Sequence, residues 1–431
     1  MGHLKRKLKV YFKGLAKENI FLRGIIRSGF DFYKKIRYKA ETIGKRVDDK
    51  TIIFSCFNGN SYADSPRAIY EYMLNDERFN DYTFVWAFKD IINKHENILG
   101  KNKNTIIVKR GAKQYRKYVA IAKYWIFNFK IDDYLKPKKN QVFVQCWHGT
   151  PLKRLGCDLI HFDNVLNTIE GMKKRYKKEA TKFSYFISPS KYASEKFISA
   201  WNLKELKKED CIIEEGYPRN DFLYNYTKED VDKVKQKIFG YYYLPYEKEV
   251  KKKKIILYAP TYRSNQHETG LGYVYKEEVD FDKLQKELGD DYIILFRAHY
   301  FVANSFDFEK YAGFVYDVSK IDDINELYII SDILITDYSS VFFDYANLKR
   351  PMIFYMYDLE HYRDESNGFY IDVEKELPGK IVKTQEELMQ EIKNISANFK
   401  YDKKYEEFNK KYNYLDDGNA SKRVVERIER D

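Results

Sequence analysis

Residues 142–152 read VFVQCWHGTPL, and they contain the pattern that organises most of the chain. The first six residues are apolar, β-branched or aromatic apart from one glutamine, so they predict a buried strand. Thr150 is a preferred N-cap residue and Pro151 a preferred first helical residue, so we expect a helix to begin at Thr150. A buried strand followed directly by a helix is typical of parallel α/β domains.

The same alternation of strand and helix patterns continues on both sides of this stretch. We predict strands at Ile52–Phe57, Thr83–Phe88, Thr105–Val108, Tyr124–Phe129, Val142–Trp147, Tyr185–Ser188, Lys254–Ala259, Tyr292–Phe296, Phe314–Tyr316, Ile333–Thr336 and Met352–Tyr355. We predict helices at Pro66–Leu74, Ala112–Ala122, Tyr192–Trp201, Phe281–Leu288, Ile324–Ile330 and Val341–Leu348. The expected fold is therefore α/β, with two doubly wound, Rossmann-type domains that face a cleft. In such domains ligands bind at the carboxyl ends of the strands.

Composition divides the chain further. A proline, clustered tyrosines and a lysine run at residues 241–254 indicate a linker between the domains. We expect an N-terminal arm at residues 1–50, a first Rossmann-like domain at 51–245 and a second at 246–415. Residues 416–431 are expected to form a C-terminal helix that packs back on the first domain.

The chain has 431 residues and a mass of 51.8 kDa, which suffices for two domains with large cores. Hydrophobic residues make up 44% and charged residues 33%, which excludes a disordered or collagen-like chain. The formal net charge is +12. Fifteen Lys/Arg and five Asp/Glu in residues 1–50 give +10, so the remaining residues carry only +2. The basicity therefore belongs to the arm.

On a helical wheel the arm separates into an apolar face and a basic face. The apolar face holds Leu4, Leu8, Tyr11, Leu15, Leu22, Ile25, Ile26, Tyr33 and Ile36, and the basic face holds Lys9, Lys13, Lys17, Arg23, Arg27, Lys34 and Lys35. We interpret the arm as a helix on an anionic membrane surface, where each basic residue contributes about 1 kcal/mol. Packing on its own domain is the alternative. A nucleic-acid partner is not expected, because no recognised nucleic-acid module follows.

Targeting signals and cysteine pairs are missing from the sequence. No run reaches the roughly 18 apolar residues of a membrane-spanning helix, and the N-terminus lacks the pattern of a signal peptide. The four cysteines form no CxxC pair, which favours a reduced, intracellular protein.

His148 stands directly after the predicted strand, at the end where α/β proteins bind ligands. A helix beginning at Thr150 would direct its backbone amides toward an anion. A histidine beside a bound phosphate can act as a general base near neutral pH. A lone histidine is more often structural, but its position at the strand end favours a catalytic role.

Arg297 and His299 follow the predicted strand Tyr292–Phe296. Arginine supplies fixed hydrogen-bond donors to a pyrophosphate, and histidine can donate a proton to a leaving phosphate. The alternative for this pair is an exposed loop.

The strand Ile333–Thr336 continues into DYSSVFFD. Ser339 and Ser340 are expected to cap a helix and to present hydroxyls and amides to a phosphate. Asp344 lies one turn further on the same face, where it could bind a hydroxyl or a diol. Asp337 could instead only brace the turn.

Weaker signals lie around these stretches. Arg219 occupies a turn that would offer it to the cleft, and Thr261 and Arg263 follow the strand Lys254–Ala259. The DxD that begins at Asp280 is better explained as a helix cap than as a metal site. No GxGxxG, GxSxG, HExxH or P-loop is present, which argues against dinucleotide binding, common hydrolases, zincins and kinases. We expect no metal site and no cofactor, and dependence on a divalent cation stays open.

Five stretches, in this order, resemble the CDP-glycerol glycerophosphotransferases of teichoic acid synthesis. They are HGTPLKRLG (148–156), GYPRND (216–221), YAPTYR (258–263), FRAH (296–299) and ITDYSSVFFDYANLKRP (335–351). The resemblance covers roughly residues 51 to 415. It implies a GT-B-like fold and a peripheral location at the cytoplasmic face of the bacterial membrane. The implied reaction moves glycerol phosphate, or in relatives ribitol phosphate, from a CDP-alditol to a lipid-linked acceptor and releases CMP.

The resemblance also implies a role for each matching residue. His148, in the first domain, would act as base on the acceptor hydroxyl, and His299 would help CMP to leave from the donor-binding second domain. The expected donor contacts are Gly149, Thr150, Pro151, Leu152, Arg219, Thr261, Arg263, Arg297, Ser339, Ser340 and Asp344. Only about 50 residues precede the matching region, whereas the long polymerases of the family carry a large additional domain. Primase, short-chain transferase and compact polymerase therefore stay open.

Two other functions are compatible with this pattern. A GT-B glycosyltransferase that uses a nucleotide sugar shares the fold and the phosphate-binding strand ends. A non-catalytic membrane-surface protein could also have kept the fold, although it would not need His148 or His299.

Overall fold

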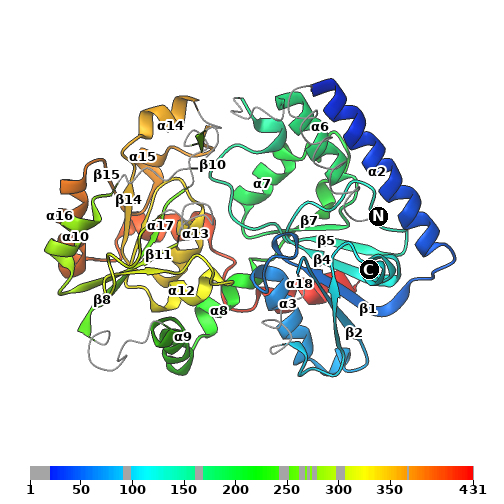
Figure 1. Cartoon of the computed structure of the whole chain (residues 1–431), viewed down its shortest axis with the longest axis horizontal. Coiled ribbons are helices and arrows are strands. Elements are labelled where there is room, and N and C mark those ends of the chain that lie inside the picture. Colours follow the sequence, from blue (N-terminus) through cyan, green and yellow to red (C-terminus); the bar gives the residue numbers. More distant parts are fainter. Residues whose placement is uncertain are drawn as a thin grey trace.

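Two parallel β-sheets form the framework of the protein, one in each half of the chain (Figure 1). The structure, a computed structural model, describes residues 20–90, 99–160, 168–241, 252–261, 267–268, 272–273, 279–297, 306–365 and 368–430. Helices flank both sheets (Figure 1). The predicted α/β fold with two doubly wound domains is confirmed.

The first sheet has the strand order β3-β2-β1-β4-β5-β6-β7. Its strands are β1 (Asp48–Ser55), β2 (Thr83–Phe88), β3 (Thr105–Lys109), β4 (Ala122–Phe127), β5 (Val142–Gln145), β6 (Tyr185–Ser188) and β7 (Ile212–Glu214). Ile52 of β1 lies beside Phe84 of β2 and Tyr124 of β4, in parallel register. The central strands read as nearly continuous apolar runs because both faces of the sheet are covered.

Helices and short 3₁₀ turns connect these strands. The helices are α3 (Asp64–Leu74), α5 (Lys113–Ile121), α6 (Ile169–Ala180) and α7 (Lys191–Ala200). The turns are η1 (Phe57–Gly59), η2 (Glu77–Phe79), η3 (Gly156–Asp158), η4 (Glu209–Cys211) and η5 (Pro218–Asn220). The chain then passes through α8 (Asp221–Asn225) and α9 (Lys228–Tyr241) to the second sheet.

The second sheet has the order β12-β11-β8-β13-β14-β15, again parallel throughout. Its strands are β8 (Lys254–Ala259), β11 (Tyr292–Phe296), β12 (Val315–Asp317), β13 (Ile333–Thr336), β14 (Met352–Tyr355) and β15 (Lys380–Val382). A small antiparallel pair, β9 (His267–Glu268) and β10 (Gly272–Tyr273), lies outside it. The strand order reverses between β8 and β13, and such switch points are where open α/β sheets bind ligands.

The helices of the second half are α10 (Phe281–Leu288), α12 (Ile324–Ile330), α13 (Val341–Tyr345), α14 (Leu359–Glu365), α15 (Val373–Glu376), α16 (Gln385–Asn398) and α17 (Lys403–Tyr412), with the turn η7 (Ala346–Leu348) after α13. Asp280 is the N-cap of α10, and its carboxylate accepts a hydrogen bond from the Lys283 amide at 3.0 Å. This agrees with the interpretation of the DxD as a helix cap.

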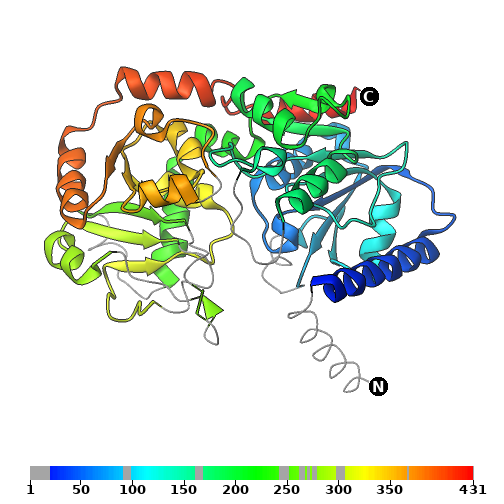
Figure 2. The same ribbon diagram turned by 90° about the horizontal axis from the view of Figure 1, so that it is seen from above.

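The C-terminal tail returns to the first domain (Figure 2). α17 reaches α7, where the rings of Tyr192 and Tyr412 pack edge-on at 4.8 Å. α18 (Ala420–Glu429) then packs on α3. Val424, Val425 and Ile428 are buried there in the same core as the first strand of the sheet.

The arm is described from residue 20 onward, as helix α2 (Ile20–Thr42). Its C-terminal end packs on α5, and Glu41 accepts hydrogen bonds from Arg116 Nε at 2.5 Å and Arg37 Nε at 2.8 Å. Residues 1–19, with the first half of the predicted amphipathic face, and most of the predicted linker lie outside the described residues.

Candidate active site

A cavity of about 410 Å³ lies between the two sheets, at the carboxyl ends of β5, β8, β11 and β13. Nine of the residues selected from the sequence line it together. They are His148, Gly149, Thr150, Pro151, Leu152, Thr261, Arg297, Ser339 and Ser340. Residues as far apart in the chain as His148 and Ser340, which are 192 positions apart, therefore meet in one place.

The turn after β5 presents His148 to this cavity. Trp147 adopts a left-handed backbone conformation, with φ of 51°, and its amide donates to Gln145 Oε1 at 2.9 Å. Such conformations are unfavourable for bulky residues and persist where the surrounding structure holds them. Trp147 is held by edge-on packing against Trp201, with ring centroids 4.7 Å apart. The turn is therefore rigidly placed.

The imidazole of His148 stacks on the indole of Trp147, with ring centroids 4.1 Å apart and planes inclined by 23°. Burial among the surrounding groups lowers the pKa of His148 below its usual 6.5. Asp64 raises this pKa and Arg219 lowers it, both by smaller amounts. The direction of this shift favours the neutral imidazole, which can accept a proton, and the ring is accessible from the cavity.

The turn also brings the two domains into close contact. A Cβ atom added at Gly149 would lie 2.8 Å from Ser340 Oγ, closer than real Cβ atoms approach such an atom. Glycine is therefore required here by the approach of the second domain. We call residues 147–150 the histidine loop and residues 337–340 the serine turn. The two segments form opposite walls of one narrow gap.

The prediction that a helix begins at Thr150 is wrong. Residues 151–155 form no helix, Lys153 pairs with Phe369 in an isolated antiparallel bridge, and the next 3₁₀ turn is η3. Their backbone groups bond to the second domain instead: Tyr370 N donates to Leu152 O at 2.9 Å, and Arg154 N donates to Gly368 O at 3.1 Å. Tyr192 Oη donates to Pro151 O at 2.7 Å. These tertiary partners replace the hydrogen bonds of a helix, so no helix N-terminus faces the cavity at this point.

The serine turn is partly as predicted. Ser340 precedes the five-residue helix α13 as its N-cap residue, but its side chain makes no capping hydrogen bond. The backbone of the turn is braced by Asp337, whose Oδ1 accepts from Thr261 N at 2.8 Å and Tyr338 N at 2.5 Å. The predicted capping by the Ser340 hydroxyl is therefore wrong, and this hydroxyl faces Gly149 instead.

Arg297 lines the cavity from the end of β11. Its Nη1 donates to the carbonyl oxygens of Ile321 at 2.9 Å and Val318 at 3.3 Å. Burial lowers its pKa, an effect that Tyr328 and Asp323 oppose. The two carbonyl contacts fix the orientation of the guanidinium beside the gap.

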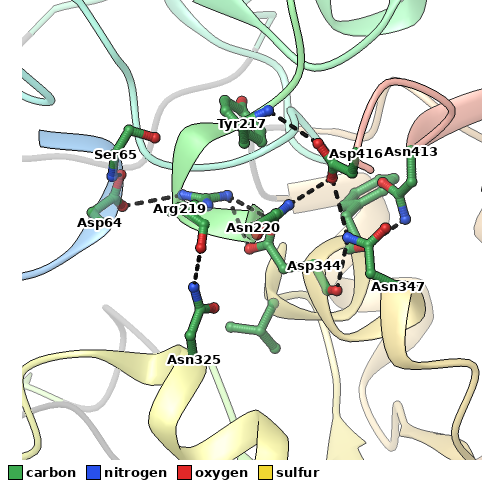
Figure 3. A network of polar contacts seen from close by, with 12 residues as sticks. Asp64, Ser65, Tyr217, Arg219, Asn220, Asn325, Asp344, Asn347, Asn413 and Asp416 are labelled. Atoms are coloured by element: carbon green, nitrogen blue, oxygen red, sulfur yellow. Dashed lines mark hydrogen bonds and ion pairs between the residues drawn. The ribbon is translucent and has the colours of Figure 1, made fainter. Parts of the chain in front are cut away.

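Arg219 and Asp344, predicted as donor contacts, do not line this cavity. They form a buried network between the domains (Figure 3). Arg219, 6% exposed, donates from Nη1 to Asp64 Oδ2 at 3.1 Å and from Nη2 to both carboxylate oxygens of Asp344, at 2.8 and 2.9 Å. Burial alone would lower the pKa of Arg219, but Asp344 and Asp64 raise it well above its usual value.

The same network continues to the C-terminal tail. Asp416 accepts from Tyr217 N at 3.0 Å, from Asn220 Nδ2 at 2.7 Å and from Asn347 Nδ2 at 3.1 Å (Figure 3). Burial raises the pKa of Asp416 to about 7. Asn220 also donates to Asp344 at 3.1 Å, so first domain, second domain and tail share one set of buried polar groups.

This network lies directly beneath the histidine loop. A Cβ atom at Gly149 would be 3.9 Å from Arg219 Nη2. The structure thus places Arg219 and Asp344 beside Gly149 rather than in the wall of this cavity, and their expected contact with the donor stays a prediction. The sequence could not reveal this, because the three charged partners are separated by more than 120 residues each.

Two further predicted residues, and two of the eight lining residues that were not predicted, complete the description. His299 and Arg263 lie outside the described residues. Lys153 and Tyr338 line the cavity but were not selected. Lys153 Nζ lies 5.0 Å from the centroid of Tyr362, which stacks on Tyr338 at 3.8 Å. Both residues belong to the quoted stretches, but no local spacing distinguishes them from structural neighbours.

Comparison with known proteins agrees with this arrangement. The teichoic acid poly(glycerol phosphate) polymerase of Bacillus subtilis (strain 168) is 38% identical over 430 residues, which are 99% of this chain and 55% of that protein. The chain thus spans about half the length of this relative. A protein of the same description from Bacillus spizizenii is 40% identical over 382 residues, 88% of this chain and 92% of that one.

A solved structure shows the same fold. A histidine variant of the wall teichoic acid polymerase TagF, soaked with CDPG, superposes with a TM-score of 0.81 at 36% identity, covering 95% of this chain and 96% of that one. This similarity confirms the GT-B-like fold. Residues 37–430 match the model of one protein family. The chain belongs to that family, the CDP-glycerol:poly(glycerophosphate) glycerophosphotransferases.

Proposed function

We propose that this protein transfers glycerol phosphate from CDP-glycerol to a hydroxyl of a lipid-linked acceptor, as a step of teichoic acid synthesis. One observation carries the mechanism: an accessible His148 faces a gap whose opposite wall is the serine turn of the second domain. Ser339, Ser340, Thr261 and Arg297 offer hydroxyls and a guanidinium to the donor phosphates there.

The acceptor hydroxyl gives its proton to His148 as its oxygen bonds to the β-phosphorus of CDP-glycerol. The bond between this phosphorus and the bridging oxygen breaks, and CMP leaves with the bonding electrons. Negative charge grows on the leaving group, so Arg297 stabilises the transition state by a charge-assisted hydrogen bond. His299 and Arg263 are proposed to assist in the same step, on the basis of the sequence alone.

Arg219 and Asp344 take a different role in this proposal. Because they are paired with each other beneath the histidine loop, they are positioning residues that act on His148 and Ser340. Positioning of reacting groups contributes a large share of the rate in phosphoryl transfer.

The choice of donor is tested by supplying one nucleotide at a time with a lipid-linked disaccharide acceptor. We expect CMP release from CDP-glycerol to exceed that from CDP-ribitol by about tenfold or more, because a site that fits a three-carbon alditol would reject a longer one. The measurement is released nucleotide together with product mass. UDP release from a UDP-sugar at a comparable rate would show a glycosyltransferase instead.

We further propose that α2 places the enzyme on an anionic membrane surface at the cytoplasmic face. No described helix is long and apolar enough to cross a membrane. Phe32 and Ile36, one turn apart on α2, are 63% and 52% exposed, so these two apolar side chains are not used for packing on the domain. Apolar side chains beside basic ones are suited to the interface of an anionic bilayer.

The double variant Phe32→Gln/Ile36→Gln is expected to bind vesicles of phosphatidylglycerol about tenfold or more weakly, because burying each apolar side chain contributes on the order of 1.5–3 kcal/mol. Co-flotation with vesicles measures the binding. Ile160→Gln is the matched control, since Ile160 is 56% exposed but lies outside α2. If both variants lose vesicle binding to the same extent, or if neither variant loses it, this face is not the membrane contact.

A further inference from the structure

A second cavity, of about 390 Å³, lies between α2 and the carboxyl ends of β1, β2 and β3. α2 contributes Lys34 and Arg37 to its wall. The first domain contributes Lys89, Arg110 and Arg116 from the segments that follow β2 and β3, and also Asp132. We call it the basic cavity.

The basic cavity has more positive than negative charge. Among the described residues two carboxylates pair with its five cations. Glu41 pairs with Arg116 and Arg37, and the hydrogen bonds from Arg116 and then Arg37 lower the pKa of Glu41 to about 2. Asp132 pairs with Arg110 at 3.3 Å. A surplus of three positive charges remains, so the cavity suits an anion.

Two of the cations are available to a ligand. Lys34 and Lys89 form no ion pair with any residue in the described ranges. The ammonium of Lys34 lies 5.7 Å from the ring centroid of Phe30 and 5.9 Å from that of Tyr134, so aromatic side chains hold it at the cavity wall. A lysine that has no carboxylate partner can bind a phosphate through its ammonium group, which acts as a point charge.

A single turn, η1, separates the basic cavity from the active site. Phe57 lies beside His148, with ring centroids 6.0 Å apart, whereas the next residue, Asn58, lines the basic cavity. The three residues of η1, Phe57, Asn58 and Gly59, have backbone φ values of 43°, 64° and 84°. Non-glycine residues adopt this conformation at functional sites where the surroundings hold them.

The surroundings do hold this turn in place. Phe57 N donates to Asn128 Oδ1 at 2.8 Å, and Arg110 Nη1 donates to Asn58 O at 3.1 Å. A Cβ atom at Gly59 would lie 2.7 Å from Lys89 N, so only glycine fits. Arg110 thus belongs both to the wall of the basic cavity and to the support of the turn next to His148.

We propose that the basic cavity binds a phosphodiester of the acceptor, so that the acceptor's terminal hydroxyl reaches His148 across η1. This inference rests on the proposed function, because it assigns the phosphate to the acceptor of that reaction. The donor is an unsuitable occupant, since the groups proposed for its phosphates are Thr261, Arg297, Ser339 and Ser340 of the second domain, which line the other cavity. A membrane lipid headgroup shares the phosphodiester chemistry, and the connection to His148 favours the acceptor over it.

The test uses a soluble oligomer of three glycerol phosphate units and the double variant Lys34→Gln/Lys89→Gln of the full chain. Isothermal titration with the oligomer should show binding about tenfold or more weaker than in the unsubstituted protein, because charge-assisted hydrogen bonds are lost. In the transfer assay the KM for the acceptor should rise by a similar factor, while the KM for CDP-glycerol and kcat stay unchanged. Lys400→Gln/Lys404→Gln, two exposed lysines near the start of α17, is the matched control.

Each outcome decides between the sources of phosphate. Unchanged oligomer binding together with weaker flotation on phosphatidylglycerol vesicles would overturn the inference in favour of a lipid headgroup. Unchanged values in both experiments would show that the cavity binds no phosphodiester. Absence of CMP release by the unsubstituted enzyme would contradict the proposed function itself, whereas the titration still reports whether these lysines bind the oligomer.

Discussion

Replacing His148 by alanine is expected to lower the turnover of CDP-glycerol by about 10²–10⁴-fold, the usual contribution of a general base. The histidine is held by the strained Trp147 turn, and the lowered pKa favours the neutral form of its ring. Alanine removes the proton acceptor without removing a hydrogen bond on which the fold depends. CMP release under saturating donor measures the loss, and circular dichroism with thermal unfolding verifies the fold.

His361→Ala serves as the control, because His361 is exposed on α14 and lies outside the cavity. It should retain full turnover. The pH profile adds a second test: the reaction needs neutral His148, so the rate of the unsubstituted enzyme should fall only as the pH drops below a value that is itself lower than 6.5. A folded His148→Ala enzyme with near-normal CMP release, or with the same acid limb, would refute the mechanism.

Replacing Arg219 by methionine is expected to destabilise the protein by about 3–5 kcal/mol, the usual effect of breaking a buried ion pair by removing one partner. The substitution leaves the carboxylates of Asp64 and Asp344 buried without their cation. The midpoint of urea unfolding measures this change. Adding Asp344→Asn to the same chain removes one uncompensated charge and should restore part of the stability.

The control for Arg219 is Arg78→Met, which removes a solvent-exposed pair with Asp76 and Glu429 and should change the free energy of unfolding by less than about 1 kcal/mol. A positioning role predicts one further effect. Because Arg219 lowers the pKa of His148 and Asp64 raises it, Arg219→Met should move the acid limb of the pH profile to higher pH. If Arg219→Met lowers the stability but leaves the pH profile unchanged, the role of Arg219 is structural only.

The sequence was sufficient to predict the strands and to predict that His148 lies at the carboxyl end of one of them. Runs such as Ile333–Thr336 are apolar because helices cover both faces of the sheet, and this burial leaves a local signal in the residues themselves. A residue that follows such a run must lie at the carboxyl edge of the sheet. For this reason His148, Arg297 and Ser339 could be placed in one cavity before any coordinates were known.

Contacts between distant segments could not be predicted in this way. Thr150 and Pro151 have the residue types of a helix start, but Gly368 and Tyr370 supply hydrogen bonds to the following residues, which form no helix. Arg219 has the residue type of a phosphate ligand, but in the structure its guanidinium pairs with the carboxylates of Asp64 and Asp344. The basic cavity likewise requires the packing of α2 on the first domain, for which no local pattern exists.

The return of the chain in α18 has a consequence for biosynthesis. Ile52 and Phe54 share a buried core with Val424 and Val425, near the opposite end of the chain. The first domain therefore lacks part of its own interior until residues 424–428 have been translated. Domains usually fold as units during synthesis, N-terminal first. This domain, which carries His148, therefore completes its core only after α18 has been translated, and a nascent chain that stops before residue 420 would expose an apolar surface on α3.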